Sequence, residues 1–131
     1  MRVYIAGPMR GYPRDNHDEF DRIEKMWKDA GHDAVSPAYL GRALGKGESR
    51  GYNSGPKFMR EVMVIDAVVI CGCDAIALMQ GWDTSRGATM ELALSHSIGI
   101  DTYDAETMEK MLYPTTPWAL LRNWPKIEEP Q

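Results

Sequence analysis

The sequence predicts a single α/β domain with a mostly parallel, doubly wound sheet of the Rossmann or flavodoxin type and helices on both faces. Three observations support this fold class. The length of 131 residues suits one domain. Short runs of strand-forming residues alternate with longer helical patterns. Glycine and proline punctuate the ends of these runs. Such alternation is typical of parallel sheets, because a helix returns the chain to the starting edge.

The N-terminal segment predicts a strand that leads into a ligand-binding loop. Residues 2–6 (RVYIA) are rich in strand-forming side chains and end at Gly7-Pro8. The following loop, GPMRGYP, leaves the carboxyl end of this strand, which is the edge where α/β folds hold ligands.

A helix and a second strand follow this loop. Asn16 and Glu19 have the spacing of a capping box, with asparagine in place of serine or threonine. Apolar residues at helical spacing then predict a helix that Gly31 ends. Residues 33–36 predict a short strand, which Pro37 closes.

The segment from Tyr39 to Pro56 predicts a long loop, because it is rich in glycine, serine and charged residues. A structureless loop of this length is usually functional or disordered. Two interpretations remain open here: a mobile flap near the site, or a tolerated surface insertion.

Residues 57–72 fit two patterns, since their apolar side chains have helical spacing whereas 67–70 alone resemble a strand. We favour the helix, because residues 74–79 (DAIALM) make a better buried strand and need a crossover before them. Asp66 then lies on a largely apolar helix and requires a partner if it is buried.

The last part of the domain predicts a loop over 80–86, a helix over 87–98, a short strand over 99–102 and a small helix over 105–112. The domain thus covers residues 1–112. A tail over 113–131 contains four prolines and two tryptophans, and it is expected to pack on the domain or on a second subunit.

Composition and charge exclude several classes of function. The formal net charge of −4 argues against a nucleic-acid polymer as the partner, and no apolar run is long enough to span a membrane. Cys71 and Cys73 lack a second ligand pair, so we expect no metal and no cofactor. We interpret them as reduced thiols close to the core of a cytoplasmic protein.

The loops after the first and third predicted strands, GPMRGYP and QGWDTSRG, should meet at one edge of the sheet. The glycines permit close backbone approach and an arginine offers a forked donor for phosphate. The later loop enters a helix whose free N–H groups can hold an anion. The expected binding residues are Gly7, Arg10, Gly11, Ser85 and Gly87.

Two carboxylates, Asp66 and Glu91, are expected near this pocket, with Tyr4 on the first strand. Paired carboxylates suit glycosidic bond cleavage through an oxocarbenium-like transition state. Ordinary structural roles remain open for each residue: a solvated glutamate in a capped helix, an ion-paired or capping aspartate, a half-buried strand tyrosine. From the residues alone, we expect a pocket for a small phosphorylated ligand, and hydrolysis of that ligand is one of the activities that stay open.

Three segments together resemble the nucleoside 2-deoxyribosyltransferase-like superfamily. They are the opening Tyr4-Ile5-Ala6-Gly7-Pro8, Asp66 followed by the strand at Asp74-Ala75-Ile76-Ala77, and Ser85-Arg86-Gly87-Ala88-Thr89-Met90-Glu91. The resemblance covers about residues 2–100 in the family's order. It implies that Glu91 is the nucleophile that attacks C1′, that Tyr4 holds this glutamate, and that Asp66 contacts the sugar and assists protonation of the departing base.

Ser85 indicates which branch of the superfamily the chain resembles. Transferases of free nucleosides usually have an aspartate at this position, whereas the branch that hydrolyses 2′-deoxynucleoside 5′-monophosphates has serine, and an Arg-Gly pair that Arg10-Gly11 matches. A serine hydroxyl at a helix N-terminus donates to a phosphate that an aspartate would repel. The resemblance therefore favours a nucleotide N-hydrolase.

Two alternatives stay open: a transferase that exchanges bases on a nucleoside, and a non-catalytic nucleotide-binding or sensor module. The resemblance also implies a homo-oligomer, a dimer or larger, with sites completed across the interface.

Overall fold

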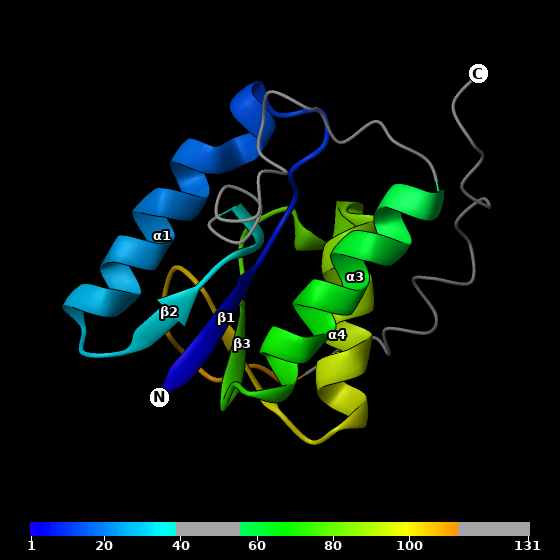
Figure 1. Cartoon of the computed structure of the whole chain (residues 1–131). Coiled ribbons are helices and arrows are strands. Elements are labelled where there is room, and N and C mark those ends of the chain that lie inside the picture. Colours follow the sequence, from blue (N-terminus) through cyan, green and yellow to red (C-terminus); the bar gives the residue numbers. More distant parts are fainter. Residues whose placement is uncertain (39–55, 113–131) are drawn as a thin grey trace.

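Four parallel strands form one sheet in the order β2-β1-β3-β4 (Figure 1). They are β1 (Arg2–Ala6), β2 (Asp33–Val35), β3 (Ala75–Leu78) and β4 (Asp101–Asp104). This all-parallel order confirms the predicted α/β class. The first three strands agree with the prediction to within a residue, and β4 begins two residues later than expected.

The computed structural model describes residues 1–38 and 56–112, without the side chains of residues 56–59. The predicted loop up to residue 55 and the tail over 113–131 therefore lie outside the described residues.

Three long helices cover the sheet on opposite faces (Figure 1). Helix α1 (His17–Asp29) lies on one face, and α3 (Pro56–Cys71) and α4 (Arg86–Ser97) lie together on the other. The structure therefore confirms the doubly wound arrangement, and it confirms the helical interpretation of the segment after residue 56. Two short 3-10 turns, η1 (Pro13–Asn16) and η3 (Trp82–Thr84), precede α1 and α4.

Alternate residues of the strands face the two helical layers, because successive side chains of a strand point to opposite faces. Val3 and Ile5 of β1 pack with Phe20, Ile23 and Trp27 of α1. Their neighbours in β1 pack into a second cluster with α3 and α4, whose buried members include Tyr4, Ala6, Ile70, Ile76, Leu78, Ala88 and Leu92. Both clusters are apolar, so the sheet is covered on each face.

The loops after β1 and β3 meet at the carboxyl edge of the sheet, as predicted. A Cβ atom added to Gly7 would lie 2.8 Å from Cβ of Met79, so only glycine fits between the ends of these two strands. Gly81 has a φ of +87° and lies against the ring of Pro8 and the hydroxyl of Tyr12. The strand order reverses direction between β1 and β3, which is where doubly wound sheets form their crevice.

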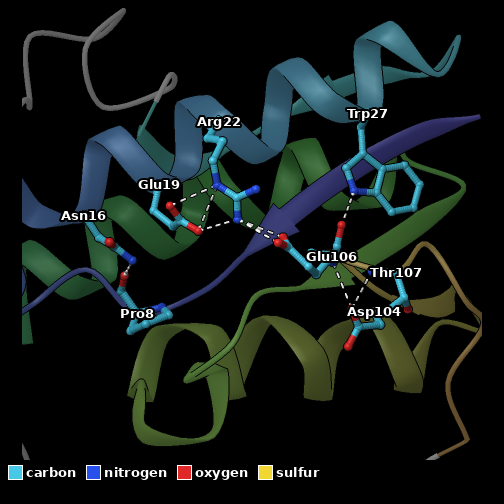
Figure 2. A network of polar contacts seen from close by, with 9 residues as sticks. Pro8, Asn16, Glu19, Arg22, Trp27, Asp104, Glu106 and Thr107 are labelled. Atoms are coloured by element: carbon cyan, nitrogen blue, oxygen red, sulfur yellow. Dashed lines mark hydrogen bonds and ion pairs between the residues drawn. The ribbon is translucent and has the colours of Figure 1, made fainter.

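The predicted capping box at the start of α1 is wrong. Asn16 precedes α1 with a left-handed φ of 64°, and its side chain makes no capping hydrogen bond. Its amide nitrogen donates instead to the carbonyl of Pro8 at 2.8 Å, and Glu19 pairs with Arg22 (Figure 2). A contact between the loop and the helix thus replaces the local cap.

The predicted helix over 105–112 is also wrong. Oδ1 of Asp104 accepts hydrogen bonds from the backbone N–H groups of Glu106 and Thr107, which makes a turn (Figure 2). The indole of Trp27 donates to the carbonyl of Ala105 at 2.8 Å, and the chain then returns to form an antiparallel bridge between residues 103 and 110. Side-chain competition and a long-range contact therefore outweigh helical spacing here.

The cysteines agree only in part with their prediction, because Cys73 is buried whereas Cys71 is exposed, and both are free thiols. No helix in the described part of the chain is long and apolar enough to cross a membrane. Residues 1–38 and 56–112 contain no group of three or more side chains arranged to hold a metal ion.

Candidate functional site

Tyr4, Asp66 and Glu91 form a buried triad on the α3–α4 side of the sheet. The hydroxyl of Tyr4, on β1, donates a hydrogen bond to Oε2 of Glu91, on α4. Asp66, on α3, lies close enough to both of them to shift their pKa values. The three side chains are 0%, 4% and 3% exposed, respectively. The structure therefore brings together all three residues that the sequence predicted as catalytic.

Each member of the triad comes from a different element, and the register of that element directs it inward. Tyr4 alternates with Val3 and Ile5, so it faces α3 and α4 while they face α1. Asp66 and Ile70 are one turn apart on the buried side of α3, and Glu91 and Leu92 are buried in α4. The sheet and both helices are thus needed to build the site.

Burial dominates the acid–base properties of the two carboxyls. It raises the pKa of Asp66 to about 6, although hydrogen bonds with Glu91 and Tyr4 lower it. Burial, and then the charge of Asp66, raise the pKa of Glu91 well above its ordinary value, against the hydrogen bond from Tyr4. No cationic group in the described part of the chain is among the causes of either shift.

Because the pKa of Glu91 is raised well above its ordinary value and that of Asp66 to about 6, the pair retains a proton near neutral pH. Tyr4 stays protonated as a donor, because burial and the charges of Glu91 and Asp66 raise the pKa of its phenol well above 10.0. The site therefore offers one carboxylate, one carboxylic acid and one fixed hydroxyl donor. This combination suits nucleophilic attack paired with proton donation.

The first turn of α4 lies directly before Glu91 and is only partly covered. Oγ of Ser85 accepts a hydrogen bond from the N–H of Ala88 at 3.2 Å, so Ser85 is the N-cap as predicted. A Cβ added to Gly87 would meet no atom closer than Oγ of Ser85 at 4.0 Å. Packing against the described residues therefore gives no reason for glycine at position 87.

The residues predicted in the first loop have different surroundings. Gly7 is buried, and its contact with Met79 explains why it is glycine. Arg10 and Gly11 are exposed in the turn that the N–H of Tyr12 closes onto the carbonyl of Met9 at 3.2 Å. Arg10 is not among the groups that shift the pKa of the triad, so it belongs to the rim of the site and not to its centre.

Sequence reasoning missed two residues that shape this edge. Asn16 binds the carbonyl of Pro8, and the half-buried Trp82 packs against the cluster that contains Tyr4. The position of Trp82 next to the turn glycine is only a weak indication in the sequence that this residue shapes the site. Asparagine at a helix start points to capping, so nothing local indicated the role of Asn16.

These features define a class of protein: a parallel α/β domain with a buried tyrosine–aspartate–glutamate triad at its topological switch point. The chain belongs to the family described as a domain of unknown function, DUF4406, whose match covers residues 1–104. That range includes β1 through β4 and every member of the triad. None of the curated proteins matches the chain.

Proposed function

We propose that the protein hydrolyses the N-glycosidic bond of a 2′-deoxynucleoside 5′-monophosphate, as a member of the nucleoside 2-deoxyribosyltransferase-like superfamily. The buried triad carries the proposal. A buried carboxyl pair is costly for stability, so a chain that retains one has a use for its raised pKa values.

In the first step the proton of the pair, which the free protein holds on Glu91 because its pKa is raised most, passes to Asp66 as the substrate enters. The carboxylate of Glu91 then attacks C1′ of the deoxyribose. A bond forms between its carboxylate oxygen and C1′, and the bond from C1′ to the base nitrogen breaks with its electron pair on the base. Asp66 supplies the proton that the base takes up. Tyr4 holds Glu91 by the hydrogen bond to Oε2, which fixes the position of the attacking group.

In the second step water attacks C1′ of the glycosyl-enzyme, and Asp66 as carboxylate accepts the proton of this water. The ester to Glu91 breaks, which regenerates the carboxylate and releases deoxyribose 5-phosphate. Asp66 and Glu91 influence each other's pKa in the free protein, so the substrate is placed beside both carboxyls.

The first turn of α4 favours a phosphorylated substrate. The helix start carries a partial positive charge, and the hydroxyl hydrogen of Ser85 remains available because Oγ accepts the capping bond. The open space beside Gly87 permits close approach to the backbone. Arg10, on the neighbouring loop, supplies a positive charge at the rim.

The same triad also suits a transferase, in which a second base replaces water in the second step. A non-catalytic nucleotide-binding module would retain the fold without either step. Incubation with a panel of nucleosides and 5′-monophosphates, with free base measured by chromatography, separates the three. Faster release of base from monophosphates than from nucleosides supports the proposal, and release from nucleosides alone contradicts it. Acceleration by a second base identifies a transferase, and binding without release identifies a binding module.

We also propose that the protein is a homo-oligomer that uses the outer face of α3. Val64 and Val68 are 65% and 70% exposed, one turn apart on this helix. Between residues 62 and 71 the only charged side chain is the inward-facing Asp66, so this part of the outer face is apolar, and the exposed Arg60 and Glu61 lie one turn before Val64. Its partner must be similarly apolar, and α3 of a second copy meets that requirement.

A further inference from the structure

Three consecutive residues before α1 adopt a left-handed backbone conformation. Arg14, Asp15 and Asn16 have φ values of 50°, 51° and 64°. Each such residue costs about 1–2 kcal/mol, less for asparagine and aspartate, so a run of three persists only where its surroundings impose it. This segment ends the loop that carries Arg10 and Gly11.

Two side-chain contacts hold the run in place. Nδ2 of Asn16 donates to the carbonyl of Pro8 at 2.8 Å, as Figure 2 shows. Nδ1 of His17 lies 2.7 Å from the carbonyl oxygen of Arg14 and is therefore the protonated nitrogen of that ring. The bond from Asn16 spans the whole loop, whereas the bond from His17 lies within its last turn.

Within the described part of the chain, the Asn16 side chain makes a hydrogen bond only to Pro8, since it does not cap α1. An asparagine at a helix start ordinarily accepts a hydrogen bond from the first turn. Here the left-handed φ turns the side chain away from the helix and toward the loop. The hydrogen bond from the Asn16 amide to the carbonyl of Pro8 therefore closes residues 8–16 into a loop of fixed conformation.

Pro8 is also the point where the two loops of the site touch. A Cβ added to Gly81 would lie 3.2 Å from Cγ of Pro8 and 3.1 Å from the hydroxyl of Tyr12. Gly81 precedes η3, which leads directly to Ser85 at the start of α4. The bond from Asn16 thus fixes the first loop against the second.

We propose that Asn16 is a positioning residue: by holding the carbonyl of Pro8, it sets the loop of Arg10 and Gly11 at the distance from Ser85 that the substrate's 5′-phosphate requires. This inference rests on the proposed function. Asn16 acts on phosphate recognition alone, because the triad takes its geometry from β1, α3 and α4.

Two substitutions separate the hydrogen bond from the backbone conformation. Asn16→Gly retains the left-handed φ without steric cost, and Asn16→Asp retains it with nearly the same shape. Neither can donate to a carbonyl as the amide does. The control is Asp15→Gly, which relaxes the neighbouring left-handed residue and removes a negative charge, so it should not weaken the binding of a phosphate.

Steady-state kinetics on a 5′-monophosphate and on the matching nucleoside give the decisive comparison. Both Asn16 variants should raise KM for the monophosphate about three- to tenfold, with kcat within about twofold of the parent and unchanged values for the nucleoside. Equal losses on both substrates, or no loss on either, would overturn the role of Asn16 while the hydrolase proposal stands.

Calorimetric binding of the 5′-monophosphate repeats the comparison without turnover. A parent that binds but releases no base refutes the hydrolase, and weaker binding by the two Asn16 variants then still supports the positioning role. Equal affinity of parent and variants refutes that role. A parent that binds no monophosphate refutes both.

Discussion

The hydroxyl of Tyr4 donates to Oε2 of Glu91 across a separation of 87 residues. One residue comes from the first strand and the other from the last helix, and Asp66 of α3 completes the triad between them. The carboxyl pair is therefore a product of the whole fold. Its raised pKa values and its fixed hydroxyl donor should control how both activity and stability depend on pH.

Tyr4→Phe should lower kcat about 10- to 100-fold without unfolding the protein, because it removes only the donor to Glu91. The hydrogen bond from Tyr4 lowers the pKa of Glu91, so its loss should raise that pKa. The acidic limb of the pH–rate profile should move to higher pH in the variant. Tyr103→Phe, on β4 outside the triad, is the matched control and should change neither quantity. A shift to lower pH would contradict this account of Tyr4.

The carboxyl pair should make the protein less stable as pH rises. Burial raises the folded-state pKa of Asp66 to about 6, and it raises the pKa of Glu91 well above its ordinary value. In the unfolded chain these carboxyls have pKa values of about 4. Above that pH the folded chain therefore binds more protons than the unfolded chain does. The stabilising contribution of the protonated pair is complete below about pH 4 and declines as pH rises through about 6.

Glu91→Gln retains the shape of the side chain without its charge. Its free energy of unfolding at about pH 7.5 should exceed that of the parent by on the order of 1–3 kcal/mol, and the difference should shrink toward about pH 5. Thermal or denaturant unfolding at several pH values measures both. Glu109→Gln, at an exposed position, should leave the profile unchanged. If Glu91→Gln were less stable than the parent at neutral pH, ionisation of the carboxyl pair would not destabilise the folded protein, which contradicts this prediction.

Alanine should have opposite effects on stability at two glycines of the site. Gly87→Ala should stabilise the protein by up to about 1 kcal/mol, because α4 has room for the methyl group and glycine is a poor helix former. It should also weaken binding of a 5′-monophosphate, measured by calorimetry. Gly7→Ala should destabilise the protein, because its Cβ would lie 2.8 Å from Met79. Unchanged monophosphate affinity in Gly87→Ala would remove Gly87 from the binding site.

Charge on the outer face of α3 should dissociate the oligomer. We expect Val64→Glu and Val68→Glu to be monomers in analytical ultracentrifugation at concentrations where the parent is a dimer or larger, because a buried carboxylate is costly. Ile98→Glu is the control, since Ile98 is an exposed apolar residue at the end of α4. A monomeric parent, or dissociation by Ile98→Glu alone, would refute an interface on α3.

The sequence predicted the sheet, the three long helices and the meeting of the first and third loops, because these depend on hydrophobic periodicity and on turn residues. It also predicted that a buried Asp66 needs a partner. The meeting of the loops also led us to expect Asp66 and Glu91 near one pocket with Tyr4. That Tyr4 holds Glu91 could be anticipated only through the family resemblance, since no local pattern joins these elements.

The errors fall where long-range contacts replace local preference. Asn16 and Glu19 have capping-box spacing, but the bond to Pro8 outweighs the cap. The segment after β4 has helical spacing, but Asp104 binds the backbone N–H groups that a helix would use, and Trp27 holds Ala105 against α1. Both contacts require the folded sheet, so a window of sequence could not contain them.

The most direct test of the central claim is to mix the protein with a 2′-deoxynucleoside 5′-monophosphate, quench with acid and measure both free base and intact protein mass. We predict that the parent releases base and carries a deoxyribose 5-phosphate adduct on the peptide containing Glu91. Glu91→Ala should give neither product. Base release by Glu91→Ala at the parent's rate, or an adduct on another residue, would contradict the assignment of Glu91 as the nucleophile.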